Sequence, residues 1–384
     1  MHITYLFCIF ARYYALCIVN YELCIDMKIF HIVSNKEWGG GEQYVYDLCH
    51  RQRADGIIVT VFCKPVESVI GKFREAGITA IPLALGGALD MGSAWRMAAV
   101  IRKTGACTIH AHNFKDAFTA CYARKLSGNK EVRVVMCRHL TRQGKDTLLY
   151  RWLYRQLDCL CFDSELSKSE FLSTCSMPLD SKIRVVRTSI VVPDEVTAAG
   201  VRQRYGIGPE EVVGMFHGRL DPEKGLDTLL DAMALLREKP LRLVLVGRGS
   251  DEYTAHLQEK AVLLNIADKV VFAGFQHPVL PFVADADFGI LASTVREGCP
   301  LSPQEYMSQG HPVVVTDNGG QREYVEDGKN GLLVAPGDAR ALAEAMSRLV
   351  GDAELRRQLG RQAKTDFDDH LNYEHYYEQI MKIY

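Results

Sequence analysis

Short apolar runs separated by helical patterns recur along the chain from residue 27 onward. In the first half, the runs expected to form strands are Lys28 to Ser34, Ile57 to Cys63, Ala80 to Leu83, Cys107 to His110, Val132 to Cys137, Leu160 to Asp163 and Arg184 to Val192. In the second half they are Val212 to His217, Arg242 to Val246, Val270 to Gly274, Phe288 to Ala292, Pro312 to Thr316 and Gly331 to Val334. Strands that alternate with helices predict an α/β protein with parallel sheets.

A chain of 384 residues is long enough for two such domains, and Pro193 to Gly200 reads as the linker between them. We therefore expect a first domain over residues 27–192, a second over 193–368 and a last helix over 369–384. Residues 1–26 are set apart because Ile3 to Asn20 is apolar and aromatic, with no small-residue cleavage site and too few residues for a typical span. Two interpretations stay open for them: an upstream extension outside the functional chain, or a membrane-associated segment.

Composition narrows the class of protein. The apolar share of 48% is that of a globular protein, and a net charge of −2 argues against a nucleic-acid binder. From Met27 to Ile190, however, about 24 Lys and Arg stand against about 15 Asp and Glu, and the balance reverses afterwards. A basic first domain suits the binding of an anionic partner. Alternatively, the uneven distribution of charge lies on solvated surfaces and has no function. The twelve cysteines show no CxxC pair, which favours buried free thiols in a reducing cytoplasm.

The most informative stretch runs from Glu297 to Gly320 and contains two carboxylates eight positions apart, Glu297 and Glu305. The order of elements puts Glu297 in a loop after a strand and Glu305 in the first turn of a helix, at the sheet edge where α/β proteins bind ligands. Carboxylates there could each hold a pair of hydroxyls. Alternatively, Ser302 to Glu305 spells a capping box with Ser302 as N-cap.

A second motif follows the strand Val212 to His217, where Gly218 opens a loop that ends at Gly225. Its Arg219 and Lys224 suit a diphosphate, because a planar fork and a compact ammonium can bind adjacent oxygens. A solvated basic loop is the alternative.

These two stretches resemble the retaining, GT-B-fold glycosyltransferases, in particular family 4 of group 1 type with its E-x7-E motif. The match includes Glu297-Gly298, Pro300-Leu301, Glu305 and the Gly-Arg-x-x-x-x-Lys-Gly loop. The resemblance implies two Rossmann-like domains facing across a cleft, with a nucleotide-sugar donor bound mainly by the second. It implies that Glu305 holds the ribose and Glu297 the donor sugar, that Arg219 and Lys224 stabilise the leaving diphosphate, and that the backbone around Cys299, Pro300 and Leu301 helps to hold the donor.

The first domain offers fewer candidates. Gly39-Gly40-Gly41 forms a turn between a strand and a helix but lacks the GxGxxG and P-loop spacings. In the resembled family a similar turn lines the cleft, which adds Gly40 and Gly41 to the donor site. His110-Ala111-His112 ends a strand, either as two hydrogen-bonded histidines or, as the resemblance implies, with His112 beside the donor sugar as a catalytic residue.

Two further segments bear on partners. The segments Arg138 to Lys145 and Tyr150 to Arg155 interleave basic and aromatic residues. This pattern suits nucleic acid, and it suits a membrane surface or an anionic acceptor as well; an ordinary amphipathic surface helix is the alternative. Because the net charge disfavours nucleic acid, we expect no nucleic-acid partner. Asp285-Ala286-Asp287 has the form of a metal-binding DxD, but its place between a helix end and a buried strand argues against a metal.

We therefore expect a glycosyltransferase that moves a sugar, with retention, to a saccharide or lipid-linked acceptor of cell-surface polysaccharide synthesis. It would need no metal or cofactor and would work in the cytoplasm, peripherally at the membrane. A nucleotide-sugar epimerase of the same fold and a silent nucleotide-sugar-binding protein are the alternatives. A dehydrogenase is disfavoured because its glycine fingerprint is missing.

Overall fold

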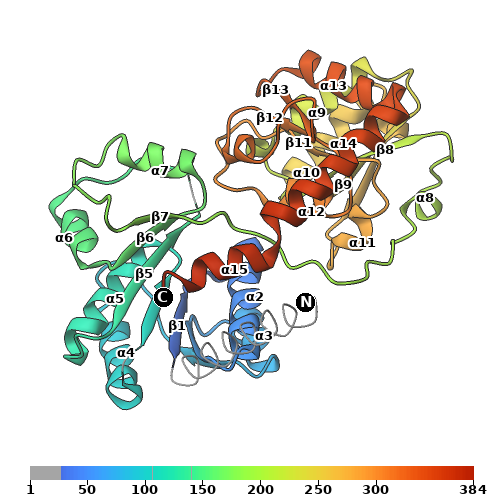
Figure 1. The fold of residues 1–384 in the computed structure, drawn as a ribbon. Coiled ribbons are helices and arrows are strands. Elements are labelled where there is room, and N and C mark those ends of the chain that lie inside the picture. The colour runs from blue at the N-terminus through green and yellow to red at the C-terminus, as the bar shows by residue number, and fades with distance from the viewer. Residues whose placement is uncertain (1–26, 106, 140) are drawn as a thin grey trace, which may run out of the picture.

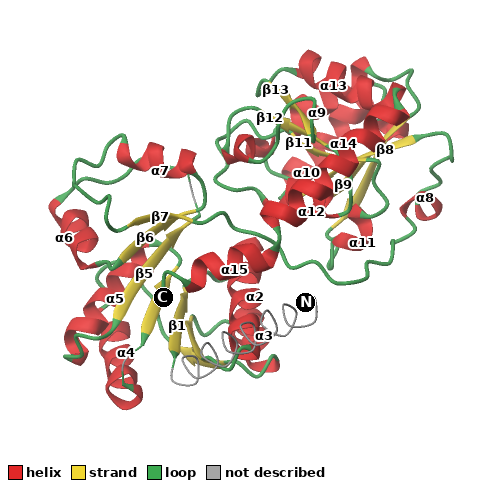
Figure 2. Ribbon diagram, in the orientation of Figure 1, coloured by secondary structure: helices red, strands yellow, loops and turns green. Residues whose placement is uncertain are grey.

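The computed structural model describes residues 27–105, 107–139 and 141–384, so the expected N-terminal extension lies outside the described residues. Two α/β units lie side by side, and the last helix of the chain returns from the second unit to the first (Figure 1). Helices flank both sheets (Figure 2). Every strand pair in both sheets is parallel, as the alternation of strands and helices predicts.

The first sheet has seven strands in the order β3-β2-β1-β4-β5-β6-β7. Its strands are β1 Lys28–Val33, β2 Ile58–Cys63, β3 Thr79–Pro82, β4 Thr108–Ala111, β5 Arg133–Arg138, β6 Cys159–Phe162 and β7 Ile183–Val185. Its helices are α2 Gly40–Ala54, α3 Glu67–Glu75, α4 Met91–Thr104, α5 Phe114–Ser127, α6 Leu148–Gln156 and α7 Glu165–Leu172. The strand order reverses direction between β1 and β4, and ligands of such sheets bind at this kind of switch point.

The second sheet has six strands in the order β10-β9-β8-β11-β12-β13, with its switch point between β8 and β11. Its strands are β8 Val212–His217, β9 Leu241–Val246, β10 Val270–Gly274, β11 Phe288–Leu291, β12 Val313–Thr316 and β13 Gly331–Val334. Its helices are α8 Val201–Arg204, α9 Leu226–Leu235, α10 Asp251–Leu263, α11 Leu280–Val283, α12 Leu301–Ser308, α13 Ala339–Gly351 and α14 Ala353–Asp366. Short 3₁₀ turns occur at η1 Pro222–Lys224, η2 Ala267–Lys269 and η3 Gly320–Glu323.

The C-terminal segment joins the two units. After α14, the π-helical turn η4 (Phe367–Leu371) leads into α15 (Tyr373–Met381), which packs with Ile380 and Tyr384 in the apolar core between α2, α3 and the first sheet. The Tyr376 hydroxyl donates to the Tyr44 hydroxyl of α2 at 2.5 Å. The last helix thus packs on the first unit, although the chain reaches it from the second (Figure 1).

The last expected strand of the first unit, Arg184 to Val192, is wrong for most of its length. Only Ile183–Val185 pairs, with β6, and the chain after Val186 has no regular structure. The polar groups of this segment bond instead to the second unit and to the C-terminal segment that follows it. Thr188 O accepts from Gln304 Nε2 at 3.0 Å, and Ser189 Oγ donates to Leu371 O. These residues form the crossing between the units.

Two further observations concern expected chemistry. Asp285 accepts from the Val201 backbone and Asp287 accepts from Arg202 and from the Val213 backbone, so both carboxylates hold the start of the second unit. The described cysteines are free thiols, and all of them are buried except Cys299, which is half-buried. In the described part of the chain, no helix has the length and apolar character needed to cross a membrane.

Candidate functional site

The second switch point brings together the loops that carry the sequence-predicted donor residues. β8 and β11 are neighbours, and the loops after their carboxyl ends hold Gly218 to Gly225 and Ser293 to Pro300. Glycine is required where these loops meet: at Gly225 the backbone has φ +68°, and a Cβ there would lie 1.9 Å from Ala292 O. The close approach of the two loops therefore depends on a residue without a side chain.

Lys224 and Glu297 form an ion pair across this approach. The Lys224 Nζ donates to Glu297 Oε1 at 2.5 Å, and both side chains are largely buried, at 20% and 18% exposed. Ser293 at the end of β11 donates to the same carboxylate oxygen. The pair fixes a cation and an acceptor-only group at one edge of the sheet, which is the chemistry needed to hold a phosphate beside a sugar hydroxyl.

Arg219 lies on the same loop as Lys224, but its side chain is exposed and weakly paired. Its side chain is 72% exposed and reaches Asp221 Oδ2 at 3.4 Å. An exposed guanidinium with one weak ion pair keeps most of its five donors available, so it can turn toward an oxyanion. The backbone of Gly218 has φ +145°, and the Gly218 carbonyl is approached so closely that a Cβ on Gly247 would lie 1.8 Å from it.

Glu305 projects from α12 toward the end of β8. Its carboxylate bonds to His217 Nε2, and His217 Nδ1 lies 2.8 Å from the Tyr306 hydroxyl. The two contacts fit a neutral imidazole that donates from Nε2 to Glu305 and accepts at Nδ1 from Tyr306. Glu305 therefore has its carboxylate held in place, and it remains 19% exposed.

The expected capping box is wrong. α12 begins at Leu301 with Pro300 as N-cap and no side-chain cap bond, so Ser302 and Pro303 already lie inside the helix. Pro303 is tolerated there because the first four N–H groups of a helix have no intrahelical partner. Glu305 is consequently the fifth helical residue rather than a first-turn residue, and it reaches His217 instead of the cap.

The backbone between the two glutamates packs against the first unit. A Cβ on Gly298 would lie 2.4 Å from Asp163 Oδ2, and a Cβ on Gly320 would lie 1.7 Å from Gly298 O. Cys299 Sγ lies 3.5 Å from Thr188 O, while Pro300 O accepts from the Tyr324 hydroxyl at 2.7 Å. Burial raises the pKa of Asp163 to about 6. The loop that carries Glu297 is thus seated at the seam between the units.

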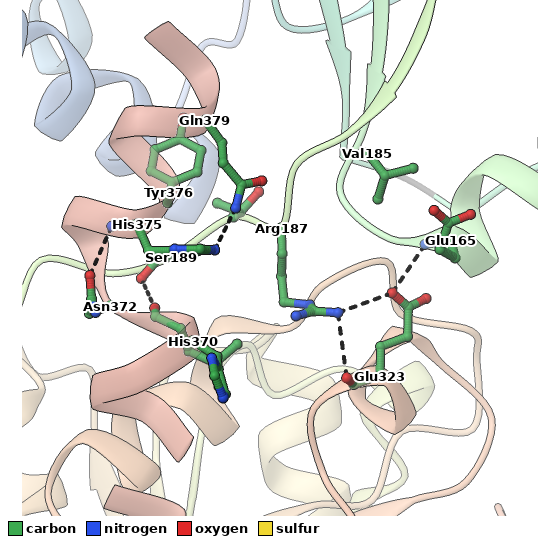
Figure 3. A pocket seen from close by; sticks show the side chains of 12 residues that line it. Glu165, Val185, Arg187, Ser189, Glu323, His370, Asn372, His375, Tyr376 and Gln379 are labelled. Atoms are coloured by element: carbon green, nitrogen blue, oxygen red, sulfur yellow. Dashed lines mark hydrogen bonds and ion pairs between the residues drawn. The ribbon is translucent and has the colours of Figure 1, made fainter. Parts of the chain in front are cut away.

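Glu323, a residue that the sequence pattern did not single out, makes several of the contacts at the seam. Its carboxylate accepts from the backbone N–H groups of Glu165 at 3.1 Å and Leu166 at 2.9 Å, at the start of α7, and from Arg187 at 3.5 Å. Figure 3 shows Glu323 pointing at the N-terminus of α7 and at Arg187. A cavity of about 200 Å³ lies beside this contact, between α7, the crossing segment and α15. Arg296 and Glu170 add a second ion pair across the seam at 2.6 Å.

The first-unit candidates occupy the first switch point. Gly40 and Gly41 are exposed at the start of α2, and a Cβ on either would meet nothing within 4 Å, so open space rather than a close approach surrounds them. His112 follows β4, half-buried, with His31 Nδ1 at 3.2 Å from its Nε2. Burial lowers the pKa of His112 well below its usual value, so the ring is neutral at physiological pH. Among the described residues, no hydrogen bond or ion pair joins His112, Gly40 or Gly41 to the second unit.

Arg138 is the one expected surface cation that the structure places inside. It is 6% exposed, it donates to Arg142 O, and its guanidinium lies over the rings of Phe114 and Phe171 at 5.3 and 5.2 Å. Arg142, Lys145 and Arg155 are exposed, whereas Arg151 is half-buried and pairs with Asp146 at 2.8 Å.

The side chains that support the site were missed by sequence reasoning: His217, Ser293, Tyr306, Asp163 and Glu323. A usable signal existed for His217 and Ser293, because both stand at the carboxyl end of a predicted strand beside a motif. Asp163 and Glu323 become visible only when the two units are placed together.

Comparison with known families settles the relationship. The model described as Glycosyltransferase Family 4 matches residues 38–192, and the model described as Glycosyl transferases group 1 matches residues 211–352. The chain belongs to the family 4, group 1 glycosyltransferases. These two matches cover every strand of both sheets except β1, and they include Gly40, Gly41, His112 and the second-unit candidates up to Glu305.

Two curated relatives and one solved structure illustrate the family. "Putative glycosyltransferase EpsD" from Bacillus subtilis (strain 168) is 34% identical over 166 residues, which are 43% of each chain. "Lipopolysaccharide core biosynthesis glycosyltransferase LpsE" from Rhizobium meliloti (strain 1021) is 36% identical over 147 residues, covering 38% of this chain and 42% of that protein. The matched region thus spans less than half the length of either relative. The crystal structure of Anabaena Alr3699/HepE in complex with UDP superposes with a TM-score of 0.81 at 20% identity, covering 93% of this chain and 99% of that one. The fold is GT-B.

Proposed function

We propose that this chain transfers a sugar from a nucleoside-diphosphate sugar to a saccharide or lipid-linked acceptor. The observation that carries the proposal is the buried Lys224–Glu297 pair at the second switch point, with Glu305 held on the neighbouring helix. In the proposal Lys224 binds the diphosphate, Glu297 the donor sugar and Glu305 the ribose, and all three side chains lie at the ligand-binding edge of one sheet. The solved Anabaena relative is a complex with UDP, which supports this class of donor.

In this proposal the charge that develops on the leaving diphosphate is stabilised by Lys224 and Arg219. A fixed ammonium whose position is set by Glu297 costs little reorganisation, and the exposed guanidinium of Arg219 closes on the phosphates when they arrive. Side-chain cations then supply the positive charge, and no metal is required at the diphosphate. Retention of the anomeric configuration is part of the proposal, on the pattern of the family, and the anomer of the product tests it.

The first unit completes the donor site beside the sugar and also supplies the acceptor side of the proposal. His112, Gly40 and Gly41 stand at the first switch point, and His112 is neutral, so it can donate or accept a hydrogen bond to a sugar hydroxyl without carrying a charge. The match to a lipopolysaccharide core glycosyltransferase supports a growing cell-envelope glycan as the acceptor.

A membrane-facing surface suits such an acceptor and is proposed at α6. Leu148 and Leu149 are 85% and 41% exposed at its start, and Arg142, Lys145 and Arg155 are exposed close by in the sequence. Apolar side chains next to cations bind the interface of an anionic bilayer without crossing it. The proposed place of action is accordingly the cytoplasmic face of the membrane.

The experiment that tests the function is a donor screen with the full chain. UDP-, GDP- and ADP-sugars are incubated singly, and nucleotide release is followed with and without a glycan extract. Lys224→Ala should lower kcat/KM on the active donor by roughly 10²- to 10³-fold, because one stabilising group of the transition state is lost. Glu305→Ala should mainly raise KM for the donor.

The matched control is Lys329→Ala, which removes an exposed lysine paired only with Glu326 in an i,i+3 ion pair and should leave the rate unchanged. Binding of a nucleotide sugar without release in any extract would favour a silent binding protein. Conversion of the donor to another nucleotide sugar without an acceptor would favour an epimerase. Binding of no donor would refute the assignment of this site.

A further inference from the structure

Three histidines from two neighbouring strands converge beneath the first switch point. His31 lies on β1, His110 on β4 and His112 directly after β4, and each offers one ring nitrogen within 4.8 Å of the nitrogens of the other two. His31 and His110 are fully buried and His112 is half-buried. The donor residues Lys224, Glu297 and Glu305 belong to the second unit, so this cluster is separate from the proposed diphosphate site.

Hydrogen bonds to the far side of two rings fix their orientation. His31 Nε2 donates to Gln52 Oε1 at 2.9 Å, which leaves its Nδ1 as an unprotonated acceptor. His110 Nδ1 contacts the Tyr384 hydroxyl at 2.6 Å, and its Nε2 is buried with no hydrogen-bond partner among the described residues. Metal-binding histidines are held in this way, with the second ring nitrogen bonded to an outer group that sets the tautomer.

The distance between the ring nitrogens of His31 and His112 fits a shared metal ion. His31 Nδ1 and His112 Nε2 are 3.2 Å apart, and two imidazole nitrogens on a tetrahedral ion at 2.0–2.1 Å are separated by about 3.3 Å. His112 Nδ1 is also buried without a partner, so the ring can carry its proton there when Nε2 binds a metal. Metal binding at Nε2 then moves the ring proton of His112 from Nε2 to Nδ1 and releases no proton, because a neutral imidazole has one N–H group and one nitrogen lone pair.

We propose that His31, His110 and His112 form a three-histidine binding site for a transition-metal dication of the Zn²⁺ class. Imidazole nitrogen suits Zn²⁺, Co²⁺, Ni²⁺ and Cu²⁺, whereas Mg²⁺ and Ca²⁺ require oxygen ligands. Three protein ligands leave a fourth position for water on the half-buried His112 side. The rings are surrounded by aromatic side chains, with Tyr44 5.7 Å from His112 and Tyr384 5.5 Å from His110 between ring centroids.

The site has a consequence for transfer, and this consequence alone rests on the proposed function. A metal on His112 Nε2 occupies the nitrogen that would otherwise bond to the donor sugar. Metal occupancy therefore inhibits transfer, and removal of the metal by a chelator restores it.

The test measures metal binding directly, on the full chain freed of metal by a chelator. Co²⁺ is added to equimolar stoichiometry and the visible spectrum is recorded, because a tetrahedral site with imidazole ligands gives d–d bands without a thiolate-to-metal charge-transfer band. Bound Zn²⁺ per chain is measured by elemental analysis after dialysis, with Mg²⁺ as the comparison ion. We expect one Zn²⁺ or Co²⁺ per chain, no retained Mg²⁺ and no charge-transfer band.

The variants are His31→Gln and His110→Gln, with His50→Gln as the matched control, since His50 is an exposed histidine on α2. Each of the first two should weaken Co²⁺ affinity at least tenfold, while the control binds as the unaltered chain does. Because a buried substitution can unfold the protein, circular dichroism accompanies each variant. Tyr384→Phe, which keeps the ring but removes the outer hydrogen bond, provides a milder variant and should weaken binding less.

A folded, unaltered chain that retains no Co²⁺, or that shows a thiolate band, would overturn the site, as would unchanged binding in a folded His31→Gln variant. None of these readouts depends on turnover. Metal binding without any donor turnover would leave the site standing and count only against the proposed transferase.

Discussion

The seam between the two units offers the sharpest mechanical prediction, and its centre is Glu323. The first N–H groups of a helix have no intrahelical partner, and at α7 those of Glu165 and Leu166 donate to the Glu323 carboxylate of the other unit. Ser164 caps the same helix from within by accepting from the Ser167 N–H at 3.1 Å, so α7 does not depend on Glu323 to form. Glu323→Ala should therefore loosen the seam without unfolding α7.

The size of the effect follows from these contacts. Hydrogen bonds to a charged group contribute about 1.5–3 kcal/mol each, but water satisfies both partners when the seam opens, and the Glu323 side chain is already 19% exposed. The favourable position of a carboxylate at a helix N-terminus adds about 0.3–1 kcal/mol. The Arg187 contact at 3.5 Å adds little. We expect Glu323→Ala to lower the free energy that favours the closed seam by about 2 kcal/mol, which lowers the ratio of closed to open molecules about 30-fold.

The assay is the distance between fluorophores placed on exposed positions of the two units, combined with kinetics. Glu323→Ala should lengthen the mean distance and lower kcat/KM for transfer. Donor affinity should change less, because the residues proposed to hold the diphosphate, the sugar and the ribose (Lys224, Glu297 and Glu305) lie in the second unit. The matched control is Glu326→Ala, a side chain 64% exposed that pairs only with Lys329. If Glu323→Ala and Glu326→Ala give the same distance and the same rate, the seam is not held as described.

Three other changes test separate parts of the structure. Gly225→Ala should abolish transfer and lower Tm by several degrees, measured by scanning calorimetry, because its Cβ would lie 1.9 Å from Ala292 O; Gly351→Ala, where a Cβ meets nothing, is the control. Burial raises the pKa of Asp116 from 3.8 to about 7, so the native state holds a proton that the unfolded state has lost, and stability falls as pH rises between these values. Between pH 5 and 7 the free energy of unfolding, measured by denaturant titration, should fall by about 2 kcal/mol less in Asp116→Asn than in the unaltered chain. The same pH dependence in both proteins would contradict the raised pKa. Neutralising the exposed cations Arg142, Lys145 and Arg155 should abolish sedimentation with anionic liposomes, a chain beginning at Met27 should still bind, and unchanged binding after neutralisation would rule out the α6 surface.

The parallel sheets were predictable because buried strands are continuous apolar runs. β8, β10 and β13 have the bounds that their sequence pattern predicts, and the other strands except β7 differ by one residue at one or both ends. The prediction failed at Arg184 to Val192, which has the same apolar character but no neighbouring strand beyond Val185. An apolar run does not show which partner a segment packs against: here the residues after Val185 form the crossing between the units and bond to Gln304 and Leu371 rather than to a neighbouring strand.

The candidate site was predictable in its motifs and unpredictable in its pairings. Lys224 and Glu297 are 73 residues apart, and their contact depends on β8 and β11 being neighbours, which strand order decides and spacing does not. The prediction of a capping box at Ser302 was wrong because the sequence contains two signals for a helix start. Pro303 fits the first turn of a helix, and Pro300 fits the N-cap. The helix begins after Pro300, where α12 packs against β11.

The same reasoning explains why the two proposed binding functions can coexist in one chain. Each sheet has one switch point, and each switch point gathers the polar side chains that cannot be placed in the apolar interior without a partner. In the second unit these side chains pair with one another, cation to carboxylate and imidazole to carboxylate, and this pairing fixes their positions for the nucleotide-sugar donor that we propose. In the first unit the corresponding side chains are neutral imidazoles, two of which keep a buried nitrogen with no partner among the described residues. In the proposed metal site the His110 nitrogen binds the ion and the His112 nitrogen carries the ring proton, so we propose that the two switch points serve different kinds of ligand.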